Sequence, residues 1–272
     1  MKREAFLLLL PGIAVLGFVF ALPVMQVLLL AFDEGQDRLG IANFTKLFAD
    51  SYYPFVAERT LRLALLITFV TALLGVPLAY VMHRAQGWIR SALIVLIVLP
   101  LMTSVVIRTF GWLVILGRGG LLARTLEILG LAPRNFSLMH TETGIVLALA
   151  QVLLPFMTLT VLAAMSRIER NLEEAARTMG AGIFATLWHV VLPLARPGIV
   201  SGALLVFALA VSSFVTPMLV GGVRLPVLAG AIYQQMTATL DWPFAAAQAT
   251  LLLILALLVI LPYARLARAR GA

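Results

Sequence analysis

The sequence predicts an all-α integral membrane protein with six membrane-spanning helices, and three observations lead to this fold class. Of the 272 residues, 62% are hydrophobic and only 12% are charged, whereas soluble domains usually contain about 25% charged residues. The mean hydropathy is +1.06. The apolar residues gather in runs near the length of about 20 residues that a helix needs to cross hydrocarbon. A water-soluble globule is therefore excluded, and the absence of cysteine excludes a disulfide scaffold.

The first apolar run covers residues 5–32 and follows Lys2 and Arg3. It is longer than the roughly 7–15 apolar residues of a signal peptide. We therefore expect an uncleaved first helix, bent or loosened at Pro11 and Pro23, which neighbouring helices can tolerate in a membrane.

Five further apolar runs predict the remaining spans, and polar links separate them. These spans cover residues 61–82, 90–116, 143–165, 197–220 and 245–264. The link His83–Gly87, between the second and third spans, is unusually short. Together the six spans predict a single transmembrane domain over residues 1–272.

The formal net charge of +8 would raise the question of nucleic acid in a soluble protein. In a membrane protein, basic residues gather in cytoplasmic loops and set the orientation, so we predict no nucleic-acid partner. Both termini and the shortest link are basic, and we predict that both termini lie in the cytoplasm. Eleven of the twenty basic residues then lie inside: Lys2, Arg3, Arg84, Arg90, Arg167, Arg170, Arg177, Arg196, Arg265, Arg268 and Arg270.

Most of the predicted cytoplasmic material lies in one link, residues 166–196, which we expect to form two short helices. Asn171 is suited to cap the first helix, with Glu174 three residues later as in a capping box. Gly180 is predicted to end that helix, because glycine readily takes the left-handed conformation that closes a helix.

The second short helix of this link is predicted at Ile183–Leu192, which is largely apolar. Pro193 and Pro197 are expected to end it before the next span, because proline lacks the backbone donor that a continuing helix uses.

The same link carries a pattern of fixed spacing. Its residues are Glu174, Ala175, Ala176, Gly180, Val190, Leu192 and Pro193. This pattern resembles the EAA loop of the permease subunits of binding-protein-dependent ABC importers, in which Glu-Ala-Ala, Gly, Ile and Leu-Pro recur at these spacings. Val190 in place of isoleucine is the departure from it.

The resemblance implies the type I ABC importer permease fold in a bacterial inner membrane. It implies that these seven residues couple the chain to an ATP-hydrolysing subunit. The expected partners are two ATP-binding subunits, a second, related permease that forms a heterodimer with this chain, a soluble substrate-binding protein and the lipid bilayer. The alternative for the first short helix is an amphipathic helix on the membrane surface.

Two shorter stretches narrow the resemblance. Val106–Trp112 and Asp241–Ala247 are similar to signatures of spermidine/putrescine-type permeases, with Ala245 where that subfamily has glycine. They imply a polyamine as the solute. Importers of iron, opines or phosphonates share much of this sequence and stay as alternatives, as does a carrier driven by an ion gradient.

Polar residues within the apolar runs, and one in the link before the last run, are candidates for a translocation path or gate: Arg108, Gln151, Ser212, Ser213, Thr216 and Gln248, with Asp241 in the link. Arginine near a helix centre costs about 2.5–3.5 kcal/mol, so Arg108 either lines a cavity or interface or reaches the outer headgroups beside Trp112. The others serve either the path or ordinary hydrogen bonds between helices, and Asp241 either the path or a solvated loop. The glycine pair Gly198 and Gly202 predicts close helix packing.

The chain is not predicted to be an enzyme. It contains no phosphate-binding loop of the Gly-x-x-x-x-Gly-Lys type, and its two lysines are Lys2 and Lys46. We therefore expect no catalytic residues, no metal site and no bound cofactor in this chain, and ATP with magnesium on the partner subunits. A gradient-driven carrier would need carboxylates or histidines within its spans, and the predicted span interiors contain none.

Overall fold

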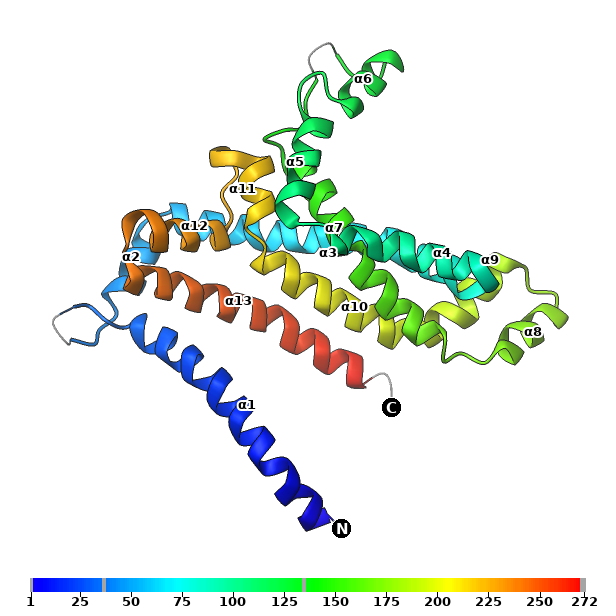
Figure 1. Cartoon of the computed structure of the whole chain (residues 1–272), viewed down its shortest axis with the longest axis horizontal. Helices are drawn as coiled ribbons and strands as arrows, with labels where there is room; N and C mark the ends of the chain where they lie inside the picture. Colours follow the sequence, from blue (N-terminus) through cyan, green and yellow to red (C-terminus); the bar gives the residue numbers. More distant parts are fainter. Residues whose placement is uncertain (1, 36–37, 134–135, 270–272) are drawn as a thin grey trace.

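The computed structural model describes residues 2–35, 38–133 and 136–269, which form helices, turns and one isolated bridge between Asp33 and Leu39. The centre of the molecule is a layer of long helices that run side by side (Figure 1). They are α3 (Tyr52–Arg84), α7 (Glu142–Met165), α10 (Leu192–Ser212) and α13 (Trp242–Ala269). Their length and apolar composition follow from the runs seen in the sequence, since only helices satisfy every backbone group in lipid.

Helix α7 is the centre of the packing. Its Ile145, Met157, Val161 and Met165 are fully buried, and α3 and α10 lie against it. Gly202 of α10 allows close approach, because a Cβ atom there would lie 2.9 Å from the Met157 sulfur. The predicted close packing at the glycine pair is confirmed.

Five helical stretches are long and apolar enough to cross a membrane within the described residues: Tyr52–Arg84, Val105–Ile128, Glu142–Met165, Ile183–Ser212 and Trp242–Tyr263. A sixth is counted if the bent pair Val215–Arg224 and Leu228–Thr239, which turns by 88°, forms one span. Shorter apolar helices cover Gly17–Leu30 and Gly87–Met102.

The third predicted span, residues 90–116, is not one continuous helix. It consists of α4 (Gly87–Val98), a 3-10 turn (Leu99–Met102) and α5 (Val105–Leu116). Thr103 and Ser104 are extended between them, with ψ of 147° and 137°. Pro100 within the turn lacks a backbone donor, which favours the interruption. Helix α5 therefore leaves the layer together with α6 (Leu121–Ile128) (Figure 1).

The fifth predicted span, residues 197–220, is shifted and broken. α9 (Ile183–Thr186), a π turn (Leu187–Val191) and α10 follow one another without a gap, so the prediction that Pro193 and Pro197 end a separate helix was wrong. Pro193 is the second residue of α10, which directly follows the π turn, so the break in the regular hydrogen bonds at this point coincides with the missing donor of proline.

Helix α10 then ends at Ser212, because Ser213 is extended with ψ of 129°. The chain continues as α11 (Val215–Gly221) and a 3-10 turn (Gly222–Arg224). α12 (Leu228–Gln234) and a π turn (Gln235–Thr239) then lead to α13. The chain therefore bends sharply where the sequence predicted a continuous span.

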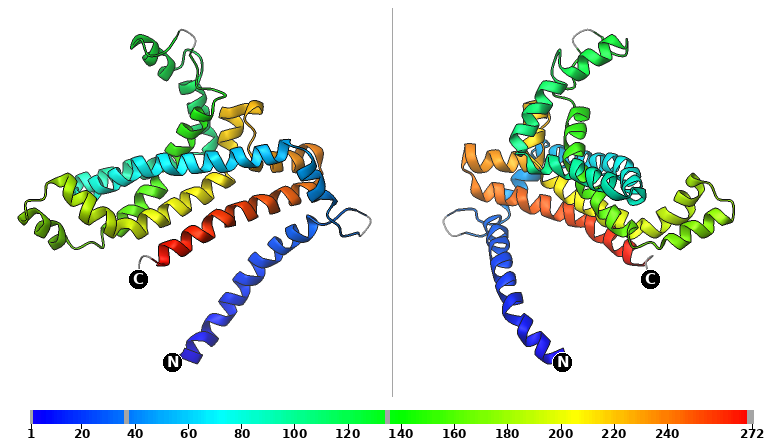
Figure 2. Two further views of the ribbon diagram at one scale, coloured as in Figure 1. Left: turned by 180° about the vertical axis from the view of Figure 1, so that it is seen from behind. Right: turned by 45° about the vertical axis from the view of Figure 1, so that its right-hand side comes forward.

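Helix α1 (Lys2–Leu30) is one helix that continues through both Pro11 and Pro23. It meets the rest of the molecule near its last turn and diverges from it toward the N-terminus (Figures 1 and 2). At the meeting point, Ala31 packs with Ala246 and Ala247 of α13.

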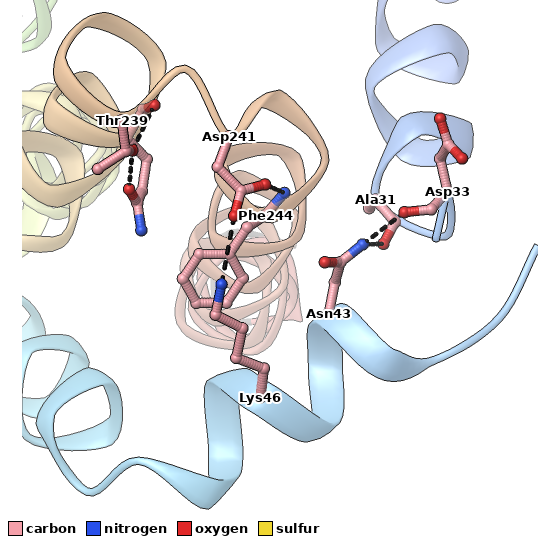
Figure 3. A network of polar contacts seen from close by, with 8 residues as sticks. Ala31, Asp33, Asn43, Lys46, Thr239, Asp241 and Phe244 are labelled. Carbon is pink, nitrogen blue, oxygen red and sulfur yellow. Dashed lines mark hydrogen bonds and ion pairs between the residues drawn. The ribbon is translucent and has the colours of Figure 1, made fainter. Parts of the chain in front are cut away.

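Helix α2 (Ala42–Ala49) lies at the end of the layer opposite α8 (Arg170–Thr178) (Figure 1), and its side chains fix this junction (Figure 3). Lys46 Nζ lies 3.2 Å from Asp241 Oδ2 and 4.1 Å from the centre of the Phe244 ring. Asn43 donates hydrogen bonds to the carbonyl oxygens of Ala31 and Asp33. α2 therefore joins the end of α1 to the start of α13.

Candidate functional site

The predicted coupling segment, residues 166–196, lies at one end of the layer, where α8 and α9 project (Figures 1 and 2). α8 covers Arg170–Thr178 and is capped at its N-terminus by the extended residue Glu169. No side chain makes the cap hydrogen bond, and Asn171 already lies within the first turn. The predicted capping role of Asn171 was therefore wrong, because α8 begins at Arg170, two residues before the first helical residue that a cap at Asn171 would require.

Gly180 ends α8 as predicted. Its φ is +87°, a conformation that carries a steric penalty for residues with a Cβ atom. The Gly180 amide donates to the Arg177 carbonyl at 2.9 Å, and the Ala181 amide donates to the Ala176 carbonyl at 3.0 Å. This pair of bonds is the Schellman motif, which satisfies the last carbonyls of a helix.

The seven residues of the coupling pattern divide into exposed and half-buried positions. Glu174, Ala175, Gly180 and Pro193 are exposed, whereas Ala176, Val190 and Leu192 are half-buried. The exposed members make a surface available to another subunit, and the half-buried aliphatic members hold the segment against the helices.

Large apolar side chains extend this surface, and sequence reasoning missed their role. Met179 is 88% exposed, Phe184 87% and Trp188 70%. The spacing of four between Phe184 and Trp188, in a link between spans, was the available signal, because residues four apart share a helix face. Exposed apolar groups of this size mark contact sites or membrane contact.

Sequence reasoning also missed Glu173, the neighbour of Glu174. Glu173 is 7% exposed and lies with Glu174 beside a cavity of about 190 Å³ that His83, Arg84, Gln86 and Arg177 also line. The unusually short link after the second predicted span therefore meets α8. Its contacts with Glu173 link residues 89 positions apart, so no local pattern could have indicated them.

Arg108 lies on α5 with most of its guanidinium group unpaired. Its Nη2 donates to the Thr103 carbonyl at 3.1 Å. Its Nε and Nη1 are buried and have no hydrogen-bond partner among the described residues. Buried donors without partners are costly, and the role of Arg108 in a path or gate stays a prediction.

Among the other path candidates of the span interiors, Gln151 and Thr216 contact another helix, whereas Ser212 and Ser213 make local bonds. Gln151 Oε1 accepts from Trp112 Nε1 at 3.4 Å, and Thr216 shares a hydroxyl contact of 3.2 Å with Thr109. The Ser212 and Ser213 hydroxyls donate to backbone carbonyls of their own helix: Ala208 and Leu209 for Ser212, and Leu209 for Ser213. Their placement on a path stays a prediction.

Gln248 and Asp241 differ in their surroundings. Gln248 is fully buried, and neither side-chain amide atom has a partner among the described residues. Asp241 Oδ1 accepts from the Phe244 amide at 3.1 Å, at the start of α13 (Figure 3). Asp241 therefore acts as a helix cap and ion-pair partner, whereas Gln248 keeps unused hydrogen-bonding capacity.

Two further cavities lie near the ends of the layer. One of about 590 Å³ lies beside the coupling segment and is lined by Thr160, Arg167, Leu172 and Ser201, among others. The other, about 160 Å³, includes Tyr52 and Gln234. The path candidates line neither of these two cavities nor the one beside Glu173.

Residues 71–270 match the family of binding-protein-dependent transport system inner membrane components. The chain belongs to this family. It is therefore a non-catalytic permease subunit of an ABC importer, in which a separate ATPase hydrolyses ATP. The described part contains no group of three His, Cys, Asp or Glu side chains that could hold a metal ion.

Curated relatives cover most of this permease. It is 34% identical to the spermidine/putrescine transport system permease protein PotB of Haemophilus influenzae over 83% of this chain and 78% of that protein. It is 32% identical to the Escherichia coli PotB over 83% of this chain and 82% of that one. It is also 35% identical to the molybdenum transport system permease protein ModB of Mycobacterium bovis, over 71% and 72% of the two chains.

Solved structures confirm the fold class. A bacterial ABC transporter that imports the polysaccharide alginate superposes with a TM-score of 0.81, over 98% of this chain and 96% of that one, at 21% identity. The MetNI methionine ABC transporter gives a TM-score of 0.60 over 78% and 93%, at 21% identity. The permease is thus a multi-pass, all-helical membrane protein with the type I ABC importer fold.

Proposed function

We propose that this permease forms the translocation path of an ATP-driven importer for a polyamine such as spermidine or putrescine, delivered by a soluble binding protein. The proposed coupling to ATP hydrolysis is supported by the position of the Glu174–Pro193 pattern in the structure. Glu174, Ala175 and Gly180 are exposed at one end of the helical layer, on a helix that Gly180 ends sharply. A short, rigid helix with small side chains suits insertion into a groove of another protein.

Partners complete the assembly in this proposal: two ATP-binding subunits, a second, related permease in a heterodimer and a substrate-binding protein. ATP and magnesium are held by the ATP-binding subunits. Closure of those subunits moves α8. The helical layer then moves as a rigid body, and the translocation path, which was open to the cytoplasm, opens to the outside. The binding protein then releases its solute into the path.

The proposed orientation in a bacterial inner membrane places α8 in the cytoplasm. The support is electrostatic, since basic residues concentrate on the cytoplasmic side of membrane proteins. Arg84 at the end of α3, together with Arg167 and Arg177, lies at the α8 end. Both termini are then cytoplasmic, and the α2 end faces the binding protein.

Polyamine as the solute is supported by the similarity to two PotB proteins over most of the chain. One observation favours a second candidate, a small anion such as a phosphonate, an opine or molybdate. The Arg108 guanidinium has two buried nitrogens without partners, and the molybdenum permease ModB is a relative. Iron is a further alternative within the same family.

Affinity capture tests the coupling to ATP. We expect the tagged permease, taken gently from its native membrane, to bring a P-loop ATPase and a second permease with it. Mass spectrometry of the captured proteins provides the measurement. Capture of the permease alone, under conditions that preserve known complexes, would favour a carrier driven by an ion gradient.

Uptake measurements test the solute. We expect a deletion strain to lose vanadate-sensitive uptake of labelled spermidine and to regain it with the wild-type gene. Labelled phosphonate, molybdate and iron are the comparison solutes. If the deletion strain takes up spermidine normally but loses uptake of molybdate or phosphonate, the solute of this importer is an anion and not a polyamine. Uptake that an uncoupler abolishes and vanadate leaves intact would contradict ATP-driven transport.

A further inference from the structure

The buried carboxylate Glu173 joins α8 to the end of α3. Its Oε1 lies 3.4 Å from His83 Nε2, and its Oε2 forms an ion pair with Arg84 Nη2. The side chain of Glu173 is 9% exposed and that of His83 is 11% exposed. The neighbouring Glu174 is exposed, so two adjacent acids of one helix have different surroundings.

Arg84 is held on both sides of this contact. Its guanidinium carbon lies 5.0 Å from the centre of the Tyr80 ring, one turn earlier on α3. A planar guanidinium can pair with a carboxylate and stack on an aromatic ring at the same time, which an ammonium group cannot do as well. The Arg84 head group is therefore oriented toward α8 before any partner binds.

Two covalent connections join α8 to the membrane-spanning helices. One is the turn at residues 166–169 after α7, and the other passes through Gly180 to α9. Neither leads directly to α3, which packs against both α7 and α10 in the core. The Glu173 contacts thus supply a third connection, to a helix that is distant in sequence.

We propose that Glu173, Arg84 and His83 act as positioning residues that transmit movement of α8 to α3. The proposal rests on the proposed function, because it assumes that a partner ATPase moves α8. With this connection, α3, α7 and α10 receive the movement together and shift as one body. Without it, α8 binds its partner through Glu174 and the exposed surface but can turn about its two covalent connections without moving α3.

The test uses the complete importer in proteoliposomes, with the Glu173→Gln and Arg84→Gln variants. Two quantities are measured: the ATPase retained by the tagged permease, and the solute imported per ATP hydrolysed. Spermidine is the probe, or whichever of molybdate, phosphonate or iron the uptake test selects. We expect retention of the ATPase and a loss of about fivefold or more in solute per ATP, within the usual range of coupling between sites.

Two further variants separate positioning from folding. The exchange Glu173→Arg with Arg84→Glu restores opposite charges and is expected to recover part of the lost coupling. Arg90→Gln removes an exposed basic residue near the same link and is expected to behave as the wild type. If Glu173→Gln imports as much solute per ATP as the wild type, or if the single and exchanged variants lose equally much, the inference on Glu173 is overturned and the proposed function stands. A wild-type chain that binds no ATPase would overturn the proposed function and the inference with it.

Discussion

Replacing Gly180 with valine is expected to leave membrane insertion intact and to reduce transport about tenfold. At φ of +87°, a residue with a Cβ atom pays about 1–2 kcal/mol, and a branched side chain is the least suited. A difference of about 1.4 kcal/mol corresponds to a tenfold change in population. In most molecules of the variant, the end of α8 would then adopt another conformation, which displaces Glu174 and the surface beside it.

The measurement for Gly180→Val is the amount of ATPase captured by the tagged permease, together with solute uptake. The matched control is Gly182→Val. Gly182 has an ordinary φ of −70°, and nothing lies within 4 Å of a Cβ atom built there. Equal capture of ATPase by Gly180→Val and the wild type would mean that the end of α8 does not position the coupling surface.

Replacing Gly202 with leucine is expected to destabilise the permease itself. A Cβ atom at this position would lie 2.9 Å from the Met157 sulfur and 3.5 Å from its carbonyl oxygen, so the Met157 side chain must move, and the rest of the leucine side chain presses against α7. Overpacking typically costs about 1–3 kcal/mol, which corresponds to a fall of roughly 2–12 °C in melting temperature for a chain of this size. Less protein would survive extraction from the membrane.

Thermal unfolding of the purified chain in detergent measures the effect of Gly202→Leu. Gly17→Leu is the control, because Gly17 also lies in a long helix but nothing is within 4 Å of a Cβ atom there. A melting temperature equal in Gly202→Leu and the wild type would show that the two helices can move apart at little cost.

The sequence predicted the helical class because a bilayer imposes a minimum length on every apolar run. It also predicted the end of α8, since the positive φ at Gly180 favours glycine. It did not predict the interruption at Thr103 and Ser104. Hydropathy measures how apolar a run is and carries little information on whether the helix through it is continuous.

The candidate site was predictable where its signal was local. The spacing from Glu174 to Pro193 lies in one segment and could be read directly, and the alginate importer confirms the fold around it. The partnership of Glu173 with Arg84 depends on how α3 and α8 meet, and 89 residues separate them. The continuation of α9 into α10 depends on a π turn, for which Pro193 gave the opposite indication.

The contact of Lys46 with Asp241 has a consequence for synthesis of the chain. These residues are 195 positions apart, so the first two helices lack this anchor until the ribosome has made the chain as far as Asp241. Contacts between distant residues form late and slowly. The junction at α2 is therefore among the last parts to assemble, and a chain truncated before α13 lacks Ala246 and Ala247, against which Ala31 at the end of the first helix packs.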